Sequence, residues 1–350
     1  MRRNTGVLAA LCALAPLMLA PPAIDPEVAA VLTRLLRFSA ADLSDLRRGR
    51  VVKHALDATA PGEIAVVGGV RVVAPMARLV EGVRRIEDFK RGPDVLQIGR
   101  FSDPPSLHDL DALVVTREDF DPRDCRVGDC GIRLPADAIR RLPGELESET
   151  DTRGARHPGS ASTQERAGRW FKRTLLEHVS AYWSGTGNRM ASYDDGSQPI
   201  RPIDEFAGIL QNERSLAALA PGLPEHLLGF PKDKLPGAED FLYWSKEKFG
   251  IAPFITVTHV TIVCPSAQTC LLTSKDVYSS RYVDASLSMT IASSDTADAN
   301  AFYLVYVNRS RANALKGRFS GLRRSIAERR ARASLEETLK SLKSRLEASR

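Results

Sequence analysis

The sequence lacks the short motifs that mark most catalytic and nucleotide-binding sites. It contains no phosphate-cradling glycine loop, no His-Glu-x-x-His, no Gly-x-Ser-x-Gly and no Cys-x-x-Cys. A nucleophilic hydrolase therefore has little support, and no cofactor is predicted. A large excess of positive charge is also missing, because the formal charge of +6 includes Arg2 and Arg3 at the extreme N-terminus. The remaining charge, about +4, is too small to indicate a nucleic-acid partner.

The composition is that of a folded globular chain, with 43% hydrophobic and 26% charged residues. Residues 1–23 form an expected secretory leader, since Arg2 and Arg3 precede an apolar run, residues 7–20, that is too short to span a bilayer comfortably. The sequence therefore predicts an exported protein, periplasmic or secreted. No clean cleavage site follows the apolar run, so an uncleaved membrane anchor is the alternative.

Four cysteines outside the leader fit an oxidising compartment. Cys125 and Cys130 enclose four residues, and Cys264 and Cys270 enclose five residues between two strand-like runs. Two local disulfides are predicted. The spacings are not the usual ones of a metal site, and no nearby histidine pair completes one, so no metal is predicted. Free thiols are a further alternative.

The N-terminal part, residues 24–143, opens with a predicted helix over residues 26–46. Period-two patterns then predict strands over residues 51–56 and 64–73, and residues 76–89 have the apolar spacing of a helix. The second of these strands ends in proline.

The middle part, residues 144–253, is predicted to be a helical insertion that caps a cavity. Residues 145–164 are polar and glycine-bearing, which is typical of a mobile loop. An amphipathic helix is expected over residues 166–183, and short helices over 203–211 and 239–249.

The C-terminal part, residues 254–350, contains strand patterns over residues 273–283, 284–291 and 301–307. Asn308 is expected to end the last strand and cap a long basic helix. Two apolar stripes on that helix lie roughly opposite each other, so a kink, a break or a change of packing partner is expected around residues 327–334. The alternative is that the second stripe packs against another chain. The first stripe is Leu315, Phe319, Leu322 and Ile326, and the second is Leu335, Leu339, Leu342 and Leu346.

The opening and the ending together resemble one known superfamily. A strand that ends in proline and leads into a helix, followed much later by three strands and a long helix, is similar to the START and polyketide-cyclase-like (helix-grip, SRPBCC) superfamily. These patterns cover about a third of the chain. The resemblance implies an α+β fold in which a curved antiparallel sheet grips a long C-terminal helix. It also implies a cavity for an apolar or amphipathic small molecule.

His259 is the first candidate for a ligand-binding or catalytic residue. It shares a predicted strand face with Ile255, Val257 and Val263. A titratable imidazole on an apolar face fits a general base or a contact to a polar ligand group, whereas a hydrogen-bonded core histidine is the ordinary alternative.

A second cluster of candidates is Tyr278, Arg281, Tyr282 and Asp284. Tyr278, Tyr282 and Asp284 are spaced by even numbers, so they are predicted to share one strand face, with Arg281 on the other. Such a face fits a pocket wall, and a structural ion-pair network is the alternative.

Residues 309–333 contain nine lysines and arginines and one acid, Glu328. A basic amphipathic helix can lie on an anionic membrane surface, and a solvated outer face is the alternative.

These patterns predict an exported protein that binds an apolar or amphipathic small molecule, a lipid being one example, between the sheet and the long helix. A binding protein is favoured over an enzyme. The alternatives are a cyclase- or hydrolase-type enzyme that uses His259 or Asp284, and an envelope module that docks another protein through the second stripe.

Overall fold

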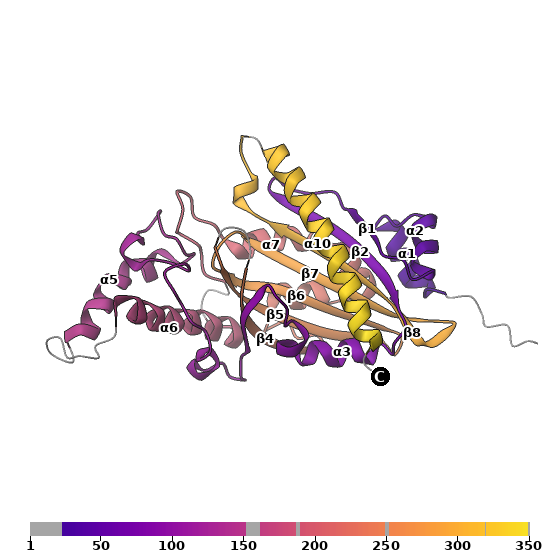
Figure 1. The fold of residues 1–350 in the computed structure, drawn as a ribbon, viewed down its shortest axis with the longest axis horizontal. Helices are drawn as coiled ribbons and strands as arrows, with labels where there is room; N and C mark the ends of the chain where they lie inside the picture. The colour runs from indigo at the N-terminus through magenta and orange to yellow at the C-terminus, as the bar shows by residue number, and fades with distance from the viewer. Residues whose placement is uncertain (1–22, 152–161, 187–189, 249–251, 319, 349–350) are drawn as a thin grey trace, which may run out of the picture.

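The computed structural model describes residues 23–151, 162–186, 190–248, 252–318 and 320–348. Its strands are β1 (Val52–Ala55), β2 (Glu63–Val72), β3 (Val95–Arg100), β4 (Glu239–Glu247), β5 (Phe254–Ser266), β6 (Thr269–Ser279), β7 (Ala285–Asp295) and β8 (Asp298–Arg311). They form one antiparallel sheet in the order β1-β2-β8-β7-β6-β5-β4-β3, which is curved and not closed (Figure 1). The predicted α+β class, with a curved sheet, a long C-terminal helix and added helices, is confirmed.

Helices cover both faces of the sheet. They are α1 (Pro26–Arg34), α2 (Ala40–Arg47), α3 (Ala77–Arg84), α4 (Ile86–Phe89), α5 (Ala136–Asp151), α6 (Thr163–Ser184), α7 (Pro202–Leu210), α8 (Arg214–Leu219), α9 (Leu223–Gly229) and α10 (Ser320–Ala348). α10 and α3 pack on one face, here called the α10 face. The opposite face is covered by α1, α2 and α7–α9 over one half and by α5 and α6 over the other.

Alternation of side chains explains how one strand serves both layers. In β7, Ala285, Leu287, Met289 and Ile291 are buried in the core shared with α1, α2 and α7. The serines and threonine between them point to the α10 face, because successive side chains of a strand point to opposite faces. This burial agrees with the strand pattern predicted over residues 284–291.

The helical insertion lies between two strands that pair directly with each other, β3 and β4. It therefore spans residues 101–238 rather than 144–253. The predicted helix over residues 239–249 is wrong, because Glu239–Glu247 form β4, which pairs with β5 over its whole length. Phe241 and Tyr243 are buried on the α10 face, and Leu242 and Trp244 on the opposite face. A run that is apolar on both faces has no period by which to distinguish a helix from a strand.

Three other element boundaries also differ from the prediction. The helix predicted over 26–46 is two helices, and Arg37 between them has a left-handed backbone with φ of 60°. The helix predicted over 76–89 is divided at Arg85 into α3 and α4. α5 continues to Asp151, so the predicted loop over 145–164 is helical at its start, and residues 152–161 lie outside the described residues. α6 begins as a helix should, with a capping box between Ser162 and Glu165.

The C-terminal helix begins later than predicted and is continuous. Asn308 lies inside β8, where its amide donates to Ser288 Oγ at 2.9 Å, so it does not cap the helix. α10 runs without a break, and its packing changes instead. Leu335, Leu339 and Leu346 are buried against the sheet at β1 and β2. Of the first stripe, Leu315 precedes the helix, Phe319 lies outside the described residues, and Leu322 and Ile326 are exposed.

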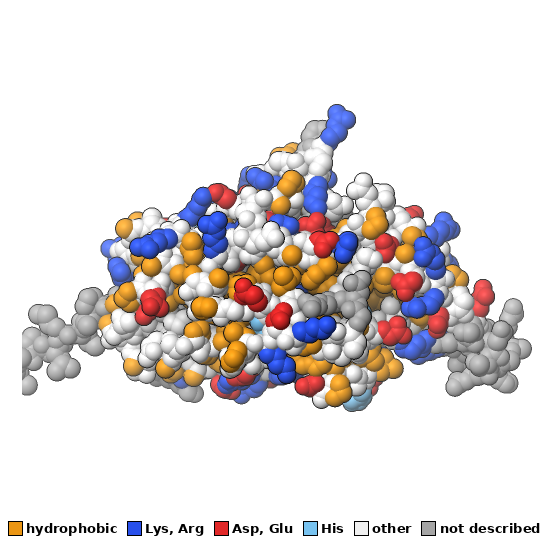
Figure 2. All heavy atoms as spheres, turned by 180° about the vertical axis from the view of Figure 1, so that it is seen from behind, with side chains coloured by type: hydrophobic (Ala, Val, Ile, Leu, Met, Phe, Trp, Pro, Cys, Tyr) orange, Lys and Arg blue, Asp and Glu red, His pale blue; other side chains and the backbone are white. Residues whose placement is uncertain are grey.

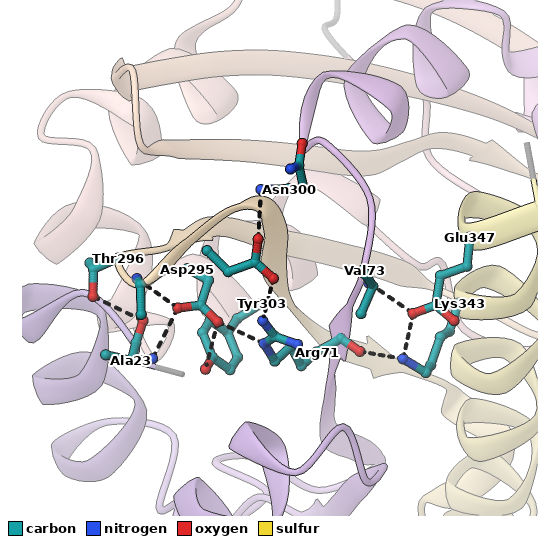
Figure 3. A network of polar contacts seen from close by, with 11 residues as sticks. Ala23, Arg71, Val73, Asp295, Thr296, Asn300, Tyr303, Lys343 and Glu347 are labelled. Atoms are coloured by element: carbon teal, nitrogen blue, oxygen red, sulfur yellow. Dashed lines mark hydrogen bonds and ion pairs between the residues drawn. The ribbon is translucent and has the colours of Figure 1, made fainter. Parts of the chain in front are cut away.

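Arg71 joins three distant parts of the chain (Figure 3). Its Nε donates to Asp295 Oδ2 at 2.7 Å, and the other carboxylate oxygen of Asp295 accepts from the backbone nitrogen of Ala23 at 3.0 Å. Its own carbonyl oxygen accepts from Lys343 Nζ at 2.7 Å. The start of the described chain, the β7–β8 turn and the end of α10 are thereby held together.

Two disulfides close local loops, Cys125–Cys130 and Cys264–Cys270, which confirms the predicted pairs. They indicate an oxidising, extracytoplasmic environment. Among the described residues, none of the helices has the length and apolarity to cross a membrane.

Candidate functional site

A cavity of about 140 Å³ lies between α5, α6 and β6 on the opposite face of the sheet. Its walls are mainly apolar, with Leu134, Ala138, Phe171 and Leu175 among the lining side chains. Of the predicted site residues, Tyr278 lines it. The position differs from the predicted one between the sheet and the long helix.

The region under α10 is closely packed where the helix meets β2. A Cβ atom added at Gly68 would lie 3.0 Å from a methyl carbon of Leu335 and 3.0 Å from one of Leu339. Both leucines are buried. The second half of α10 therefore covers the core and does not form the wall of a binding cavity.

His178 supplies the cavity with a hydrogen-bond acceptor. Its Nε2 lies 3.2 Å from the carbonyl oxygen of Val277, so Nε2 carries the proton and donates it. Burial lowers the pKa of His178, which keeps the ring neutral at pH 7 and leaves Nδ1 as an acceptor. Within the described part of the chain, Nδ1 has no hydrogen-bond partner.

Two tyrosines contribute rings to the cavity wall, but their hydroxyl groups are already engaged. The hydroxyl of Tyr278 donates to the carbonyl oxygen of Arg133 at 2.9 Å, and that of Tyr193 accepts from the backbone nitrogen of Ser279 at 3.0 Å. Burial raises the pKa of both phenols, so they are neutral. The charged side chains Asp137, Arg141 and Glu177 stand at the rim, and all three are exposed.

His259, the strongest sequence candidate, lies in a different cluster. It is fully buried, with its Nε2 2.9 Å from Asp240 Oδ1 and its Nδ1 2.7 Å from the hydroxyl of Tyr182. Thr261 donates to the same oxygen of Asp240 at 2.7 Å, and the ring of Phe230 lies 4.3 Å from that of His259. Both nitrogens of His259 are therefore used inside the protein.

The protonation states in this cluster follow from its hydrogen bonds. Burial disfavours the charged form of His226, but its hydrogen bond to Asp240 outweighs this and raises the pKa of His226. Burial also opposes ionisation of Asp240, yet hydrogen bonds from His226 and His259 hold the pKa of Asp240 well below its usual range. Burial lowers the pKa of His259, so this ring is neutral. It donates to Asp240 and accepts from Tyr182.

The remaining predicted residues lie in the turn after β6. β6 ends at Ser279, so the even spacing of Tyr278, Tyr282 and Asp284 does not place them on one strand face. Tyr282 has φ of 65°, and its hydroxyl contacts the backbone of Ala252. Asp284 is buried and paired with Arg133 at 2.7 Å.

Arg281, the last of the predicted residues, donates to the carbonyl oxygen of Glu118 at 3.2 Å. The structure thus places His259 apart from Tyr278 and the turn residues, whereas Tyr278 and Asp284 are linked through their shared partner Arg133.

A polar row on the α10 face was not found from the sequence. The hydroxyl of Tyr306 and Ser288 Oγ lie 2.7 Å apart, and Thr258 donates to Asp276 at 3.2 Å. At the edge of the row, Lys90 pairs with Glu247. The available signal was the alternation of polar residues in adjacent strands, as in Ser286, Ser288 and Thr290 of β7 and in Ser274 and Asp276 of β6.

No family model, curated protein or solved structure matches this chain. In the described part of the chain, no group of three His, Cys, Asp or Glu side chains gathers in a way that could hold a metal ion.

Proposed function

We propose that the protein is an exported binding protein, periplasmic or secreted, that holds a small, largely apolar molecule in the cavity between α5, α6 and β6. The single observation that carries this proposal is the cavity, with its apolar walls and one acceptor nitrogen. Ligand sites in proteins are mostly apolar concavities with a few placed polar groups.

The volume of the cavity limits the size of the ligand. Pockets for drug-sized ligands measure about 300–1,000 Å³, whereas an apolar cavity of about 150 Å³ in another protein accommodates benzene. A volume of about 140 Å³ therefore suits one six-membered ring or the end of a longer amphipathic molecule. The charged rim at Arg141 and Glu177 can face the polar part of such a molecule.

The Nδ1 acceptor of His178 favours a ligand that can donate a hydrogen bond. His178 lines the cavity and is partly exposed, so a ligand hydroxyl can donate a hydrogen bond to its Nδ1 in place of water. A ring or short chain with one hydroxyl group therefore fits better than the same molecule without it.

The proposal of a binding protein also draws on the START-like resemblance, although the cavity lies on the sheet face opposite to α10 rather than under this helix. One long strand, β2, leads into α3 and α4, and the remaining strands lead into the C-terminal helix. The insertion between β3 and β4 supplies α5 and α6, the two helices of the cavity wall.

The test compares phenol with toluene, which have the same size but differ in the hydroxyl group. We expect phenol to bind with a Kd of about 1 mM or lower, as a ligand of seven heavy atoms can, and toluene to bind several-fold more weakly. Heteronuclear NMR titration would locate both at α6.

Ala191→Leu serves to fill the cavity, because Ala191 lines it and is only partly buried. Binding should be lost in this variant and retained in the matched control Ala299→Leu, which adds the same side chain at an exposed position of β8. Equal binding by the two variants, or no binding of either probe at millimolar concentration, would contradict the proposal.

A further inference from the structure

The first half of α10 is a helix whose outward face has no packing partner among the described residues. Residues 321–326 are exposed without exception, including Leu322 at 65% and Ile326 at 43%. At about 100° per residue, Ile326 lies about half a turn from the buried Leu335, so it points away from the sheet. In Figure 1 this end of α10 stands at the top of the molecule, beyond the strands.

Arginines surround these two apolar side chains. Between residues 320 and 334 there are five arginines and one acid, Glu328, which pairs with Arg324 at 3.4 Å. Arg329 and Arg330 are both exposed, and neither has an ion-pair partner within the described residues. On the helix they flank the direction of Leu322 and Ile326. Figure 2 shows Lys and Arg side chains on the part that projects at the top of the molecule.

This arrangement matches the chemistry of a lipid–water interface. Leucine and isoleucine side chains can enter the boundary between headgroups and acyl chains, while arginines beside them reach anionic headgroups. A protein partner of the same charge complementarity would need an acidic surface with its own apolar pocket, and an anionic bilayer offers both features together.

We propose that the outward face of residues 320–334 docks on an anionic lipid bilayer through Leu322, Ile326, Arg329 and Arg330. The cavity lies on the other side of the sheet, so docking leaves its mouth uncovered and does not depend on the proposed ligand.

The test measures co-sedimentation of the whole protein with phosphatidylcholine vesicles that contain no anionic lipid or roughly one third phosphatidylglycerol. Binding is expected only with phosphatidylglycerol, and it should be lost between about 50 mM and about 500 mM salt. Arg329→Gln with Arg330→Gln should weaken binding roughly 25-fold, since each basic residue near such a surface contributes roughly fivefold. Leu322→Ser with Ile326→Ser should also weaken it.

The matched control is Arg47→Gln with Arg48→Gln on α2, which removes the same charge from another exposed helix. If the control weakens binding as much as the α10 variant, the attraction comes from net charge alone and the proposal is wrong. The same holds if the wild-type protein does not bind phosphatidylglycerol vesicles. Sedimentation velocity without lipid gives a further outcome, because self-association that Leu322→Ser and Ile326→Ser abolish would assign this face to a second copy of the chain and overturn the proposal.

Discussion

His226 donates a hydrogen bond from each of its two ring nitrogens, and Asp240 receives one of them. Nε2 of His226 lies 3.0 Å from Asp240 Oδ1, and Nδ1 lies 2.7 Å from the carbonyl oxygen of Asp233. Since both partners are acceptors, His226 is held as an imidazolium. The pair fastens α9 to β4, and through His259 and Tyr182 the same carboxylate reaches α6.

Asp240→Asn should lower the free energy of unfolding by about 2–3 kcal/mol at pH 7, because it leaves a nearly buried cation without its counter-charge. Urea unfolding measures the change. The matched control is Asp45→Asn at an exposed ion pair with Arg48 and Arg50, which should cost less than about 1 kcal/mol. Equal losses in the two variants would show that the buried cluster contributes no more than a surface pair.

The pair formed by His226 and Asp240 should make the stability of the protein depend on pH. A raised pKa means that His226 contributes stability below its ordinary pKa of about 6.5 and loses it as the pH rises through the folded-state value. His226→Gln should therefore reduce the fall in stability above about pH 6.5. Urea unfolding of both proteins at several pH values checks this, and an unchanged slope in the variant would contradict it.

Asp276 on the α10 face should make the protein less stable as the pH rises, whereas an aspartate with a lowered pKa has the opposite effect. Burial raises the pKa of Asp276 to about 7, with the charge of Lys90 opposing the shift. The folded state then binds more protons than the unfolded chain between about pH 4 and about pH 7, so stability falls as the pH rises through this range. Asp276→Asn should remove this fall and be more stable than wild type at pH 8 by about 1–2 kcal/mol. Thermal melting across this range measures it, and Asp88→Asn at an exposed site should keep the wild-type slope.

Gly68→Ala should move α10 away from the sheet. The added Cβ would meet the carbonyl oxygen of Val52 at 2.9 Å as well as the methyl groups of Leu335 and Leu339. Overpacking of this kind costs about 1–3 kcal/mol. Gly321→Ala is the matched control, because a Cβ there meets nothing within 4 Å and lies in a helix. A Gly68→Ala protein as stable as this control would contradict the close packing.

Loss of the Cys264–Cys270 disulfide should destabilise the protein moderately. The bond joins the ends of β5 and β6 across a separation of six residues, and a loop this short corresponds to about 2 kcal/mol. Cys264→Ser with Cys270→Ser should lower the unfolding midpoint in urea. Wild-type protein kept in reducing agent should move in the same direction, and no shift in either sample would refute the prediction.

Strands with alternating side chains were predictable, and strands without alternation were not. The period-two pattern of β7 indicates the sheet face on which Leu287 and Met289 lie, and this pattern depends only on neighbouring residues. The Phe241–Trp244 run of β4 carries no such period, because both of its faces are buried. Its pairing with β3 and β5 makes it a strand, and pairing is a long-range property.

The candidate site residues were likewise predictable only in part. His259 was correctly placed on an apolar strand face, yet its partners Asp240 and Tyr182 come from other elements and depend on the register that sets Leu242 opposite His259. Tyr278 was named, but the cavity beside it exists because α5 and α6 pack there. A local pattern can therefore indicate that a side chain is unusual without revealing what it faces.

The position of β8 in the sheet determines when the sheet can form. β8 lies between β2 and β7, although β2 ends at residue 72 and β8 begins at residue 298. Until β8 has been made, β1 and β2 can pair only with each other in the final sheet, and an isolated two-stranded hairpin is marginally stable at best. A chain that emerges from a ribosome or an export channel in order from its N-terminus thus cannot join the two parts of its sheet before residue 311 has appeared. Assembly of the complete sheet therefore waits for nearly the whole chain.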